Sequence, residues 1–455
     1  MKYLSDYITK ENLNEWIEAK EDILLIANAG AGKTYLLLEQ LVAEARLKGV
    51  KVLYCYNRKT MRTQFAQSYA EQHDNLDVVS YQSLEKQQLF TKDERYLTQY
   101  DIILCDECHY FVSDSFTNTT YISFEKIQRN NAMKIYVTAT PNNFQSIAHL
   151  TYKPFRTLDF RSLTRQNVDS IELVQETSLF DAAEKHYLKN NTVVHFENNK
   201  DHNRTLALEF QIEGYKTTYI DKDTDNEVTQ AIESTNDKQN VFVDFLATTS
   251  TNENGVNFNI ANDSVITFRK IVDFTSLVQS AARLRKYADN QNKTIKMLVN
   301  MPHKNLLLKA IEHNTVALES LYLKRSEALK FDFITTKIEY DFKIAKLESE
   351  NKTFNEMNSY SDLKEYYRLQ LTALYPVATI KVLDKYDLLD IEEVLNDLLC
   401  NEDKIILDTD MQKLVKEEIG CGMNVINNKM AGKFKITSKR STKGQKKMIW
   451  ILKRV

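Results

Sequence analysis

Short apolar runs alternate with longer helical patterns along the first two thirds of the chain. Near the start, a strand pattern, a helix pattern and a second strand pattern follow one another at residues 23–26, 35–48 and 51–55. The same order recurs at residues 192–196, 204–213 and 217–220. A glycine, Gly49 or Gly214, follows each helix pattern, as is typical of helix ends. Strands that alternate with helices favour a parallel sheet covered on both faces, so we expect two tandem α/β domains, at residues 1–165 and 166–302.

The pattern changes after residue 302. Helical periodicity with abundant Lys and Glu predicts a helical segment over residues 303–375. We expect residues 376–455 to form a separate basic domain, with two short helices followed by two strands, at residues 411–418, 424–430, 433–438 and 447–452. Helix, turn, helix and basic hairpin is the order of a winged-helix module, whose second helix enters a DNA groove.

Composition is that of an ordinary globular protein. The 455 residues are 43% hydrophobic and 27% charged, no apolar run is long enough for a bilayer, and the first residues lack the apolar region of a signal peptide. The odd number of cysteines, five, argues against a disulfide framework and fits a reducing compartment. We therefore expect a cytoplasmic protein that has no membrane partner. Cys105 and Cys108 imitate a C-x-x-C metal pair, but a zinc site would need a second close pair, so incidental thiols are favoured.

Charge is distributed unevenly. No acidic residue follows Glu418, whereas ten basic residues do. Removing these ten charges from the net charge of −3 leaves about −13 on residues 1–418. A basic module on an acidic body indicates polyanion binding, so Lys439, Arg440 and Lys443 in the predicted hairpin are candidate phosphate contacts.

A glycine-containing loop follows the first strand pattern and opens the first helix pattern. The loop consists of Ala27, Asn28, Ala29, Gly30, Ala31, Gly32, Lys33 and Thr34. It matches a nucleotide-phosphate loop, except that Ala27 stands where the first glycine would be. Gly30 and Gly32 allow successive backbone N–H groups to face phosphates. Lys33 is expected to reach the β- and γ-phosphates, and the Thr34 hydroxyl to ligate Mg²⁺, so the sequence predicts ATP and Mg²⁺ as cofactors.

An acidic pair follows another apolar strand pattern, at residues 101–105. The segment continues with Asp106, Glu107, Cys108 and His109. Carboxylates at the end of a strand suit a nucleotide-bound Mg²⁺. We expect Asp106 to hold the metal shell, and Glu107 to orient and deprotonate the attacking water.

These two segments resemble motifs I and II of superfamily 2 helicases, the second in a DEAH-like spelling with Cys at its third position. Other segments resemble further motifs in the family's order. Thr138-Ala139-Thr140 resembles motif III, which couples hydrolysis to strand movement, and His109 resembles the residue that links the two domains. Residues 57–59 and 80–84 resemble motifs Ia and Ib, which lie on the nucleic-acid backbone. The resemblance therefore implies nucleic-acid contacts from Arg58, Tyr81 and Gln82.

The second predicted domain carries two further resemblances. Residues 247–257 resemble motif V and imply that Thr248 contacts nucleic acid and that Gly255 and Asn257 lie near the nucleotide. Residues 279–286 resemble motif VI, which senses ATP from across the cleft and implies roles for Gln279 and Arg283. The family's second arginine aligns with Lys286, one residue after Arg285. Lysine cannot make the planar bidentate contact of arginine, so the choice between the two residues stays open.

The resemblance covers about residues 20–300 and implies two RecA-like domains and an ATP-driven motor that moves along nucleic acid and unwinds it. DNA is preferred over RNA because residues 1–39 contain no glutamine, so the adenine-reading Q motif of DEAD-box RNA helicases is missing, and because of the predicted winged helix. Adenine would then stack on an aromatic residue, with Tyr3, Tyr7 and Trp16 as open candidates.

The expected role is in replication, recombination or repair, performed by a monomer of phage or mobile-element type. Two alternatives stay open: a double-stranded DNA translocase that serves a defence or restriction assembly without unwinding, and an ATP-dependent RNA helicase. Replication or defence proteins are the expected partners. Of the eight histidines, only His109 lies in a motif, and we expect no histidine metal site because no ligand partners are closely spaced.

Overall fold

The computed structural model of the chain describes all residues except 1, 58–68, 87–96, 114–118, 165, 176, 198, 221–242, 250–257, 260–261, 270–273, 286–291, 331–333, 384–394, 397, 400–401, 408–410, 414, 416–422 and 441–447. The chain divides into two compact units. The first comprises residues 1–180 and 187–381, and the second comprises residues 181–186 and 382–455. In the described residues, no helix combines the length and the apolar character that a membrane span requires.

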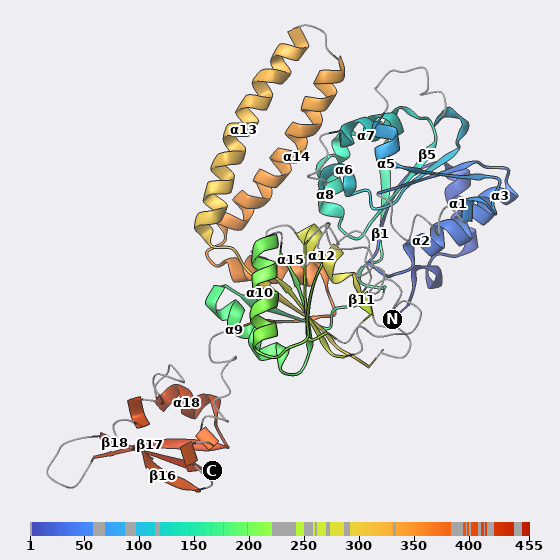
Figure 1. Cartoon of the computed structure of the whole chain (residues 1–455). Coiled ribbons are helices and arrows are strands. Elements are labelled where there is room, and N and C mark those ends of the chain that lie inside the picture. The colour runs from blue at the N-terminus through green and yellow to red at the C-terminus, as the bar shows by residue number, and fades with distance from the viewer. Residues whose placement is uncertain are drawn as a thin grey trace. The chain divides into compact units, whose positions relative to one another are not determined.

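The first sheet of the larger unit is six-stranded and parallel, as the strand and helix patterns predict. Its order is β3-β2-β4-β5-β1-β6. Figure 1 shows this sheet with β1 and β5 labelled. The strands are β1 (Asp22–Ile26), β2 (Val52–Tyr56), β3 (Leu76–Ser80), β4 (Ile102–Cys105), β5 (Met133–Thr138) and β6 (Phe155–Asp159). Successive side chains of β1 enter opposite cores: Ile23 and Leu25 join one apolar cluster, and Leu24 and Ile26 join the other. The sheet is therefore buried on both faces.

The helices of this half cover both faces of the sheet. They are η1 (Leu4–Asp6), α1 (Lys10–Ala19), α2 (Lys33–Tyr35), η2 (Leu36–Leu41), α3 (Val42–Leu47), α5 (Tyr81–Glu85), α6 (Tyr110–Ser113), α7 (Thr120–Arg129), α8 (Pro141–Ser146) and η4 (Ala148–Leu150). The helix predicted at residues 35–48 is present, but it begins at Lys33 and its middle turn, η2, is a π-helix. Such turns occur often at functional sites, and this one follows the phosphate loop directly.

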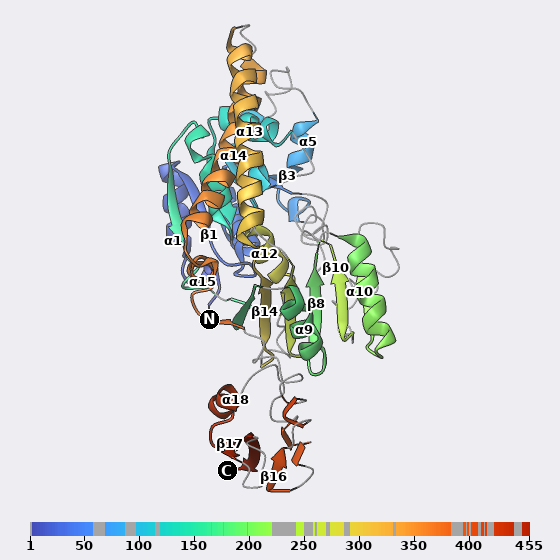
Figure 2. The same ribbon diagram turned by 90° about the vertical axis from the view of Figure 1, so that its left-hand side faces the viewer.

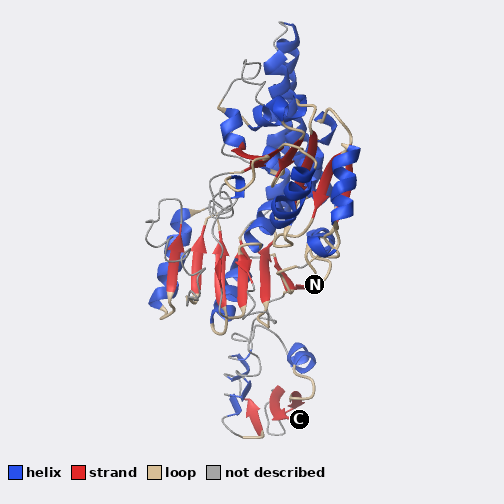
Figure 3. Ribbon diagram, turned by 90° about the vertical axis from the view of Figure 1, so that its right-hand side faces the viewer, coloured by secondary structure: helices blue, strands red, loops and turns tan. Residues whose placement is uncertain are grey.

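The second sheet of the larger unit has seven strands in the order β15-β7-β14-β12-β8-β10-β9. Figure 3 shows strands of this sheet in red, lying side by side. They are β7 (Ser170–Val174), β8 (Thr192–Phe196), β9 (Thr217–Ile220), β10 (Phe245–Thr248), β12 (Ser264–Phe268), β14 (Ile295–Asn300) and β15 (Thr379–Val382). Its helices are α9 (Thr177–Leu188), α10 (Lys200–Ile212) and α12 (Phe274–Ala281), and a separate two-stranded pairing joins β11 (Phe258–Asn259) to β13 (Leu284–Arg285). Two parallel-sheet α/β domains in tandem are thus confirmed.

The predicted helical segment consists of α13 (Lys304–Lys330), α14 (Ile334–Ser359) and α15 (Leu363–Leu374). The first two run side by side as a long hairpin (Figures 1 and 2). Phe342 of α14 enters a core cluster of the first sheet and contacts Phe124, with 5.4 Å between ring centroids. From α15, Tyr367 packs on Phe274 of α12 at 5.1 Å. The helical segment therefore packs on elements of both sheets.

The smaller unit contains a three-stranded antiparallel sheet in the order β16-β18-β17. Its elements are β16 (Lys404–Leu407), α18 (Met423–Lys429), β17 (Phe434–Arg440) and β18 (Met448–Arg454). Ile426 of α18 packs with Leu407, Ile436 and Leu452 in its core. The predicted hairpin strands are present within about two residues of their expected bounds, whereas half of the helix predicted at residues 411–418 lies outside the described residues.

Candidate active site

Strand order brings the three predicted nucleotide motifs together. Strands β4, β5 and β1 are neighbours in the sheet, and all run in the same direction. The acidic pair, Thr138-Ala139-Thr140 and the phosphate loop follow or end these strands in that order. They therefore share the carboxyl edge of the sheet, which is where ligands bind in open α/β folds.

The phosphate loop has the backbone that its glycines allow. Gly30 and Gly32 have φ angles of 79° and 85°, a left-handed region that side chains with a Cβ rarely occupy. The Lys33 side chain is 5% exposed, and its Nζ donates to the carbonyl oxygens of Ala27 and Asn28, both at 3.1 Å. The Asn28 side chain donates in turn to the carbonyl of Arg161 at 2.7 Å. The ammonium group is thus held in place by the loop itself.

The first carboxylate of the acidic pair is fixed by its neighbours. Asp106 is 3% exposed, accepts a hydrogen bond from the Tyr54 hydroxyl, and accepts another from the Glu107 amide at 3.0 Å. The Tyr81 hydroxyl donates to the Asp106 carbonyl at 2.9 Å. Glu107 has a φ angle of 48°, a conformation that costs energy for a non-glycine residue and persists where surrounding contacts impose it. Tyr54 was not singled out from the sequence.

A chain of polar contacts leads away from Glu107. Its Oε2 lies 3.4 Å from His109 Nδ1, which lies 3.3 Å from the Thr138 hydroxyl. Thr138 Oγ1 accepts from the Thr140 amide at 3.0 Å. Gln279 of α12 donates to the same Glu107 oxygen at 3.4 Å. We call this series of contacts, which runs from Gln279 through Glu107, His109 and Thr138 to Thr140, the Gln279–Thr140 chain. It joins the predicted motifs II, III and VI.

The structure describes the other motif VI residues to different extents. Arg283 lies in the turn between α12 and β13, is 9% exposed, and donates its amide to Ser280 at 3.0 Å. Arg285 is described only as backbone of β13, and Lys286 lies outside the described residues. A second contact to α12 comes from Asn143 of α8, which donates to the Thr275 hydroxyl at 2.8 Å.

A cavity adjoins the phosphate loop, with about 330 Å³ of space that is partly open to solvent. Asn28 and Ala29 of the loop line it on one side, and Val278 and Ala281 of α12 on the other. Tyr375, which follows α15, also lines it.

The three aromatic candidates for adenine stacking differ in exposure. Trp16 is 4% exposed and belongs to the core, so its rings are not available for stacking. Tyr7 donates its hydroxyl to the Leu163 carbonyl at 3.1 Å. Tyr3 is 47% exposed and lies against the phosphate loop, where a Cβ built on Gly32 would be 3.5 Å from its ring. Of the three, Tyr3 is the one that is both accessible and close to the loop.

The residues predicted to contact nucleic acid differ in their burial. Gln82 donates to Asn57 at 3.0 Å, and both side chains are half-buried at the carboxyl edge of the first sheet. Tyr81 and Thr248 are fully buried, so neither side chain is accessible to a nucleic-acid strand in this conformation. The remaining predicted site residues lie outside the described residues or are described only as backbone, namely Arg58, Gly255, Asn257, Lys439, Arg440 and Lys443.

The thiols near the acidic pair have no sign of reactivity. Cys55, Cys105 and Cys108 are buried and free. Burial raises the pKa of all three thiols, so they remain protonated and pack as small apolar side chains. That the C-x-x-C spacing is incidental stays a prediction.

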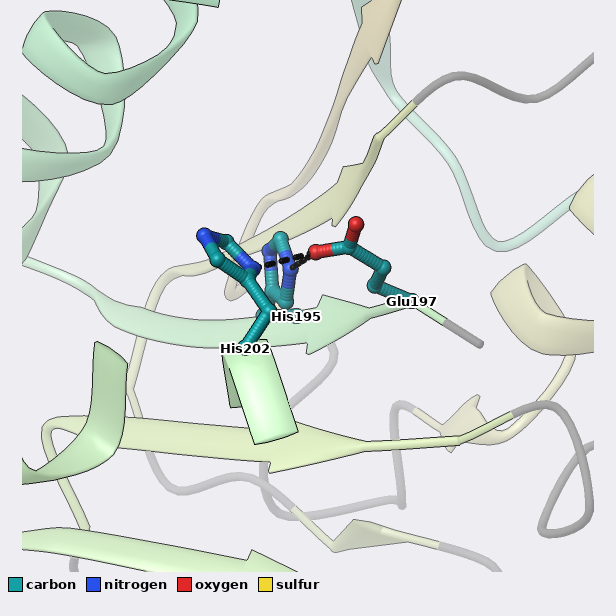
Figure 4. Close-up of side chains that lie close together, drawn as sticks. All are labelled: His195, Glu197 and His202. Carbon is teal, nitrogen blue, oxygen red and sulfur yellow. Dashed lines mark hydrogen bonds and ion pairs between the residues drawn. The ribbon is translucent and has the colours of Figure 1, made fainter. Parts of the chain in front are cut away.

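A His–Glu–His cluster at the end of β8 was missed from the sequence. His195, Glu197 and His202 place one ligand-type atom each within 4.8 Å of one another, so the expectation that no histidines are grouped with ligand partners is corrected (Figure 4). The spacing His-x-Glu-x4-His is the sequence feature that could have indicated the cluster. Strand β8 and the first turn of α10 bring the three side chains together, which local spacing alone does not reveal.

The cluster is satisfied by its own hydrogen bonds. Arg269 Nη1 lies 3.0 Å from His202 Nε2, and because arginine only donates, that nitrogen accepts. In its neutral form, His202 therefore carries its hydrogen on Nδ1 and donates to Glu197 Oε2 at 2.5 Å. Burial opposes ionisation of Glu197, but hydrogen bonds and charge from His195 and His202 outweigh it and lower the pKa of the carboxyl. A metal bound to His202 Nδ1 would displace that hydrogen. The neutral ring would then carry its hydrogen on Nε2, which could no longer accept from Arg269, so the guanidinium would also have to move.

Comparisons with known proteins give one family-model match and several solved structures with a similar fold. Residues 67–143 match the family model described as type III restriction enzyme, res subunit. A search of curated proteins finds no significant match. The fold is similar to that of Dbp5 from S. cerevisiae bound to RNA and ADP BeF3, with 10% identity, 83% of this chain and 89% of that chain covered, and a TM-score of 0.48. It is also similar to a DEAD box protein from Methanococcus jannaschii, with 14% identity, coverage of 82% and 91%, and a TM-score of 0.37.

Structural similarity at this level carries no argument about substrate. The family-model match and the helicase-type motifs assembled on one sheet edge support a nucleic-acid helicase of superfamily 2 that hydrolyses ATP.

Proposed function

We propose that this chain is a motor that hydrolyses ATP to move along and unwind DNA. The observation that carries the proposal is the Gln279–Thr140 chain, because it gives α12 a direct contact with the catalytic carboxylate. A lone phosphate-loop domain has no need of such a contact. A motor does, since it must link the state of the nucleotide to the relative movement of two domains.

The residues of the site fit a nucleotide with Mg²⁺. Ala27 and Asn28 offer Lys33 backbone carbonyls, and phosphate oxygens are stronger acceptors for an ammonium group. The Thr34 hydroxyl and the Asp106 carboxylate are oxygen ligands of the kind that Mg²⁺ prefers. When bound, the metal would neutralise developing phosphate charge. Glu107 would orient the attacking water and accept its proton, with His109 and Gln279 holding the carboxylate in position.

The second domain would contribute positive charge. Arg283 follows α12 directly, so a shift of α12 that accompanies nucleotide binding would move it. We assign it the role of the arginine that neutralises charge on the transferred phosphoryl group. Arg285 or Lys286 would assist. For the base, the cavity beside Ala29 and the exposed ring of Tyr3 are the two candidate sites.

The preference for DNA rests on two features. The segment before the phosphate loop lacks the glutamine of the Q motif. In the smaller unit, α18 precedes a hairpin of β17 and β18, and β16 pairs with β18, an arrangement that supports the winged-helix proposal. Domain limits at residues 165, 302 and 375 remain our proposal, as do a role in replication, recombination or repair and a phage or mobile-element origin.

A second candidate is a double-stranded DNA translocase that does not separate strands. It is favoured by the family-model match to a restriction subunit over residues 67–143. Strand displacement and triplex displacement should be measured on the same preparation. Release of the third strand without separation of a duplex would select this alternative.

The nucleotide site itself is tested by Lys33→Ala. We expect ATP hydrolysis stimulated by nucleic acid to disappear, because the phosphates lose their ammonium contact. Lys309→Ala, at an exposed position of α13, removes the same charge away from the site and should hydrolyse ATP like the unmodified protein. Stimulated hydrolysis that survives in Lys33→Ala would refute the site assignment.

A further inference from the structure

The outer face of the sheet in the smaller unit carries a row of three lysines. The strand register places Lys404 of β16 directly opposite Lys453 of β18, and Lys453 directly opposite Lys435 of β17. All three side chains are exposed. Neighbouring strands lie about 4.8 Å apart, so the row crosses the whole sheet with an ammonium group on each strand. We call Lys404, Lys435 and Lys453 the lysine row.

Alternation along the strands separates this face from the core. The residues next to the row, Ile436 of β17 and Leu452 of β18, point the other way and are buried against Ile426 of α18. One position further along, Ile406, Ile451 and Thr437 return to the outer face, and Ile406 is 61% exposed. The lysine row therefore lies on the face opposite α18, whereas a winged helix reads DNA through its second helix.

The row is electrostatically unfavourable in the isolated protein. Like charges directly opposite each other on paired strands destabilise a sheet. Among the described residues, none places a carboxylate within ion-pair distance of these three ammonium groups. Residues 419–455 contain no Asp or Glu at all. An arrangement that costs stability and is not neutralised within the described chain indicates an anionic partner.

We propose that the lysine row binds the phosphate backbone of the nucleic acid on which the motor works. A polyanion with closely spaced charges fits it, because duplex DNA carries about one charge per 1.7 Å of axis and a row of ammonium groups can bind adjacent phosphates without reading sequence. This inference rests on the proposed function for the identity of the polymer. It adds a second binding surface, separate from the carboxyl edge of the first sheet and from the predicted hairpin contacts.

The test uses the full-length protein with all three lysines of the row changed to alanine. DNA affinity is measured against salt by fluorescence anisotropy. We expect the slope of log affinity against log salt to fall in magnitude by about 2 for single strands and about 3 for duplex, since each lost phosphate contact removes roughly 0.7–0.9. Lys309, Lys324 and Lys330, all exposed on α13, provide a control triple with the same charge change, which should keep the original slope.

One further variant and one further measurement serve as controls. Replacing the row with arginines should restore the slope, because phosphate contacts need charge at these positions. Because the alanine triple removes repulsion, its melting temperature should be unchanged or higher, so weakened binding would not come from unfolding. An unchanged slope in the alanine triple overturns the inference, as does tighter binding of anionic phospholipid vesicles than of DNA. If Lys33→Ala keeps stimulated ATP hydrolysis but the slope of the alanine triple still falls, the assignment of the nucleotide site fails and the lysine row stands.

Discussion

The carboxyl edge of the first sheet and the outer face of the small C-terminal sheet both carry charged side chains, but they hold them in opposite ways. At the first, Lys33 and Asp106 are nearly inaccessible, and each is fixed by hydrogen bonds. At the second, the lysine row is exposed, and no described carboxylate pairs with it. Buried, pre-positioned groups act strongly at short range, which chemistry requires. Exposed charges attract a polyanion without fixed geometry, which suits movement along a polymer.

The largest expected effect comes from the arginine assigned to the second domain. Arg283→Ala should reduce the rate of ATP hydrolysis by roughly 10³–10⁵, the range typical of arginines that neutralise transition-state charge. Nucleotide affinity should change far less. Single-turnover hydrolysis, together with binding of a fluorescent ATP analogue, measures both quantities. Turnover close to that of the unmodified protein would remove Arg283 from the site.

Glu107→Gln tests the carboxylate that is proposed to accept the proton of the attacking water. The amide keeps the shape but cannot accept a proton, so hydrolysis should fall by about 10²–10⁴. DNA affinity and its salt slope should be unchanged, since Glu107 is not part of the lysine row. A comparable loss in both hydrolysis and DNA affinity would show that the two regions are not as independent as proposed.

The contrast between buried and exposed side chains can also be measured in the helical segment. Phe342 is 4% exposed and packs on Phe124, so Phe342→Ala should lower the free energy of unfolding by about 3–5 kcal/mol. Leu323 lies on α13 and is 69% exposed. Leu323→Ala should therefore change the free energy of unfolding by less than about 0.5 kcal/mol. Denaturant titration monitored by circular dichroism compares the two. Equal effects would mean that α14 does not pack on the first sheet in solution.

The smallest effect is expected at the His–Glu–His cluster. The pKa of Glu197 is lowered in the folded protein, so its ionised form contributes stability at neutral pH. This contribution is lost as the pH falls through the folded pKa, which lies below the ordinary value of a glutamate. Glu197→Gln should therefore cost about 1–2 kcal/mol at pH 7, and the difference from the unmodified protein should shrink in acid. Exposed Glu209→Gln on α10 is the matched control. A cost that stays constant across the pH range would contradict this account.

The placement of the proposed nucleotide motifs in the fold was predictable because each motif is local in sequence. Gly30, Gly32 and Lys33 lie between a strand and a helix, and the acidic pair ends a strand, so spacing alone places them. Parallel strand order then brings them to one edge. The π-helical turn at Leu36–Leu41 was not predictable, because an apolar run looks the same in α- and π-helical geometry.

What the sequence did not reveal depends on contacts between distant segments. Tyr54 reaches Asp106 because β2 and β4 are neighbours, and Gln279 reaches Glu107 only after two domains have folded. The lysine row likewise requires the register of three strands, one of which begins far from the other two in the chain. Neither periodicity nor spacing contains that information.

The central claim is that Gln279 connects the second domain to the catalytic carboxylate, and the most direct test is the ratio of ATP turnover with and without single-stranded DNA. We predict that the ratio falls close to one in Gln279→Ala. It should be retained in Asn143→Ala, which breaks a different hydrogen bond to α12 without touching Glu107. Undiminished stimulation in Gln279→Ala would contradict the account.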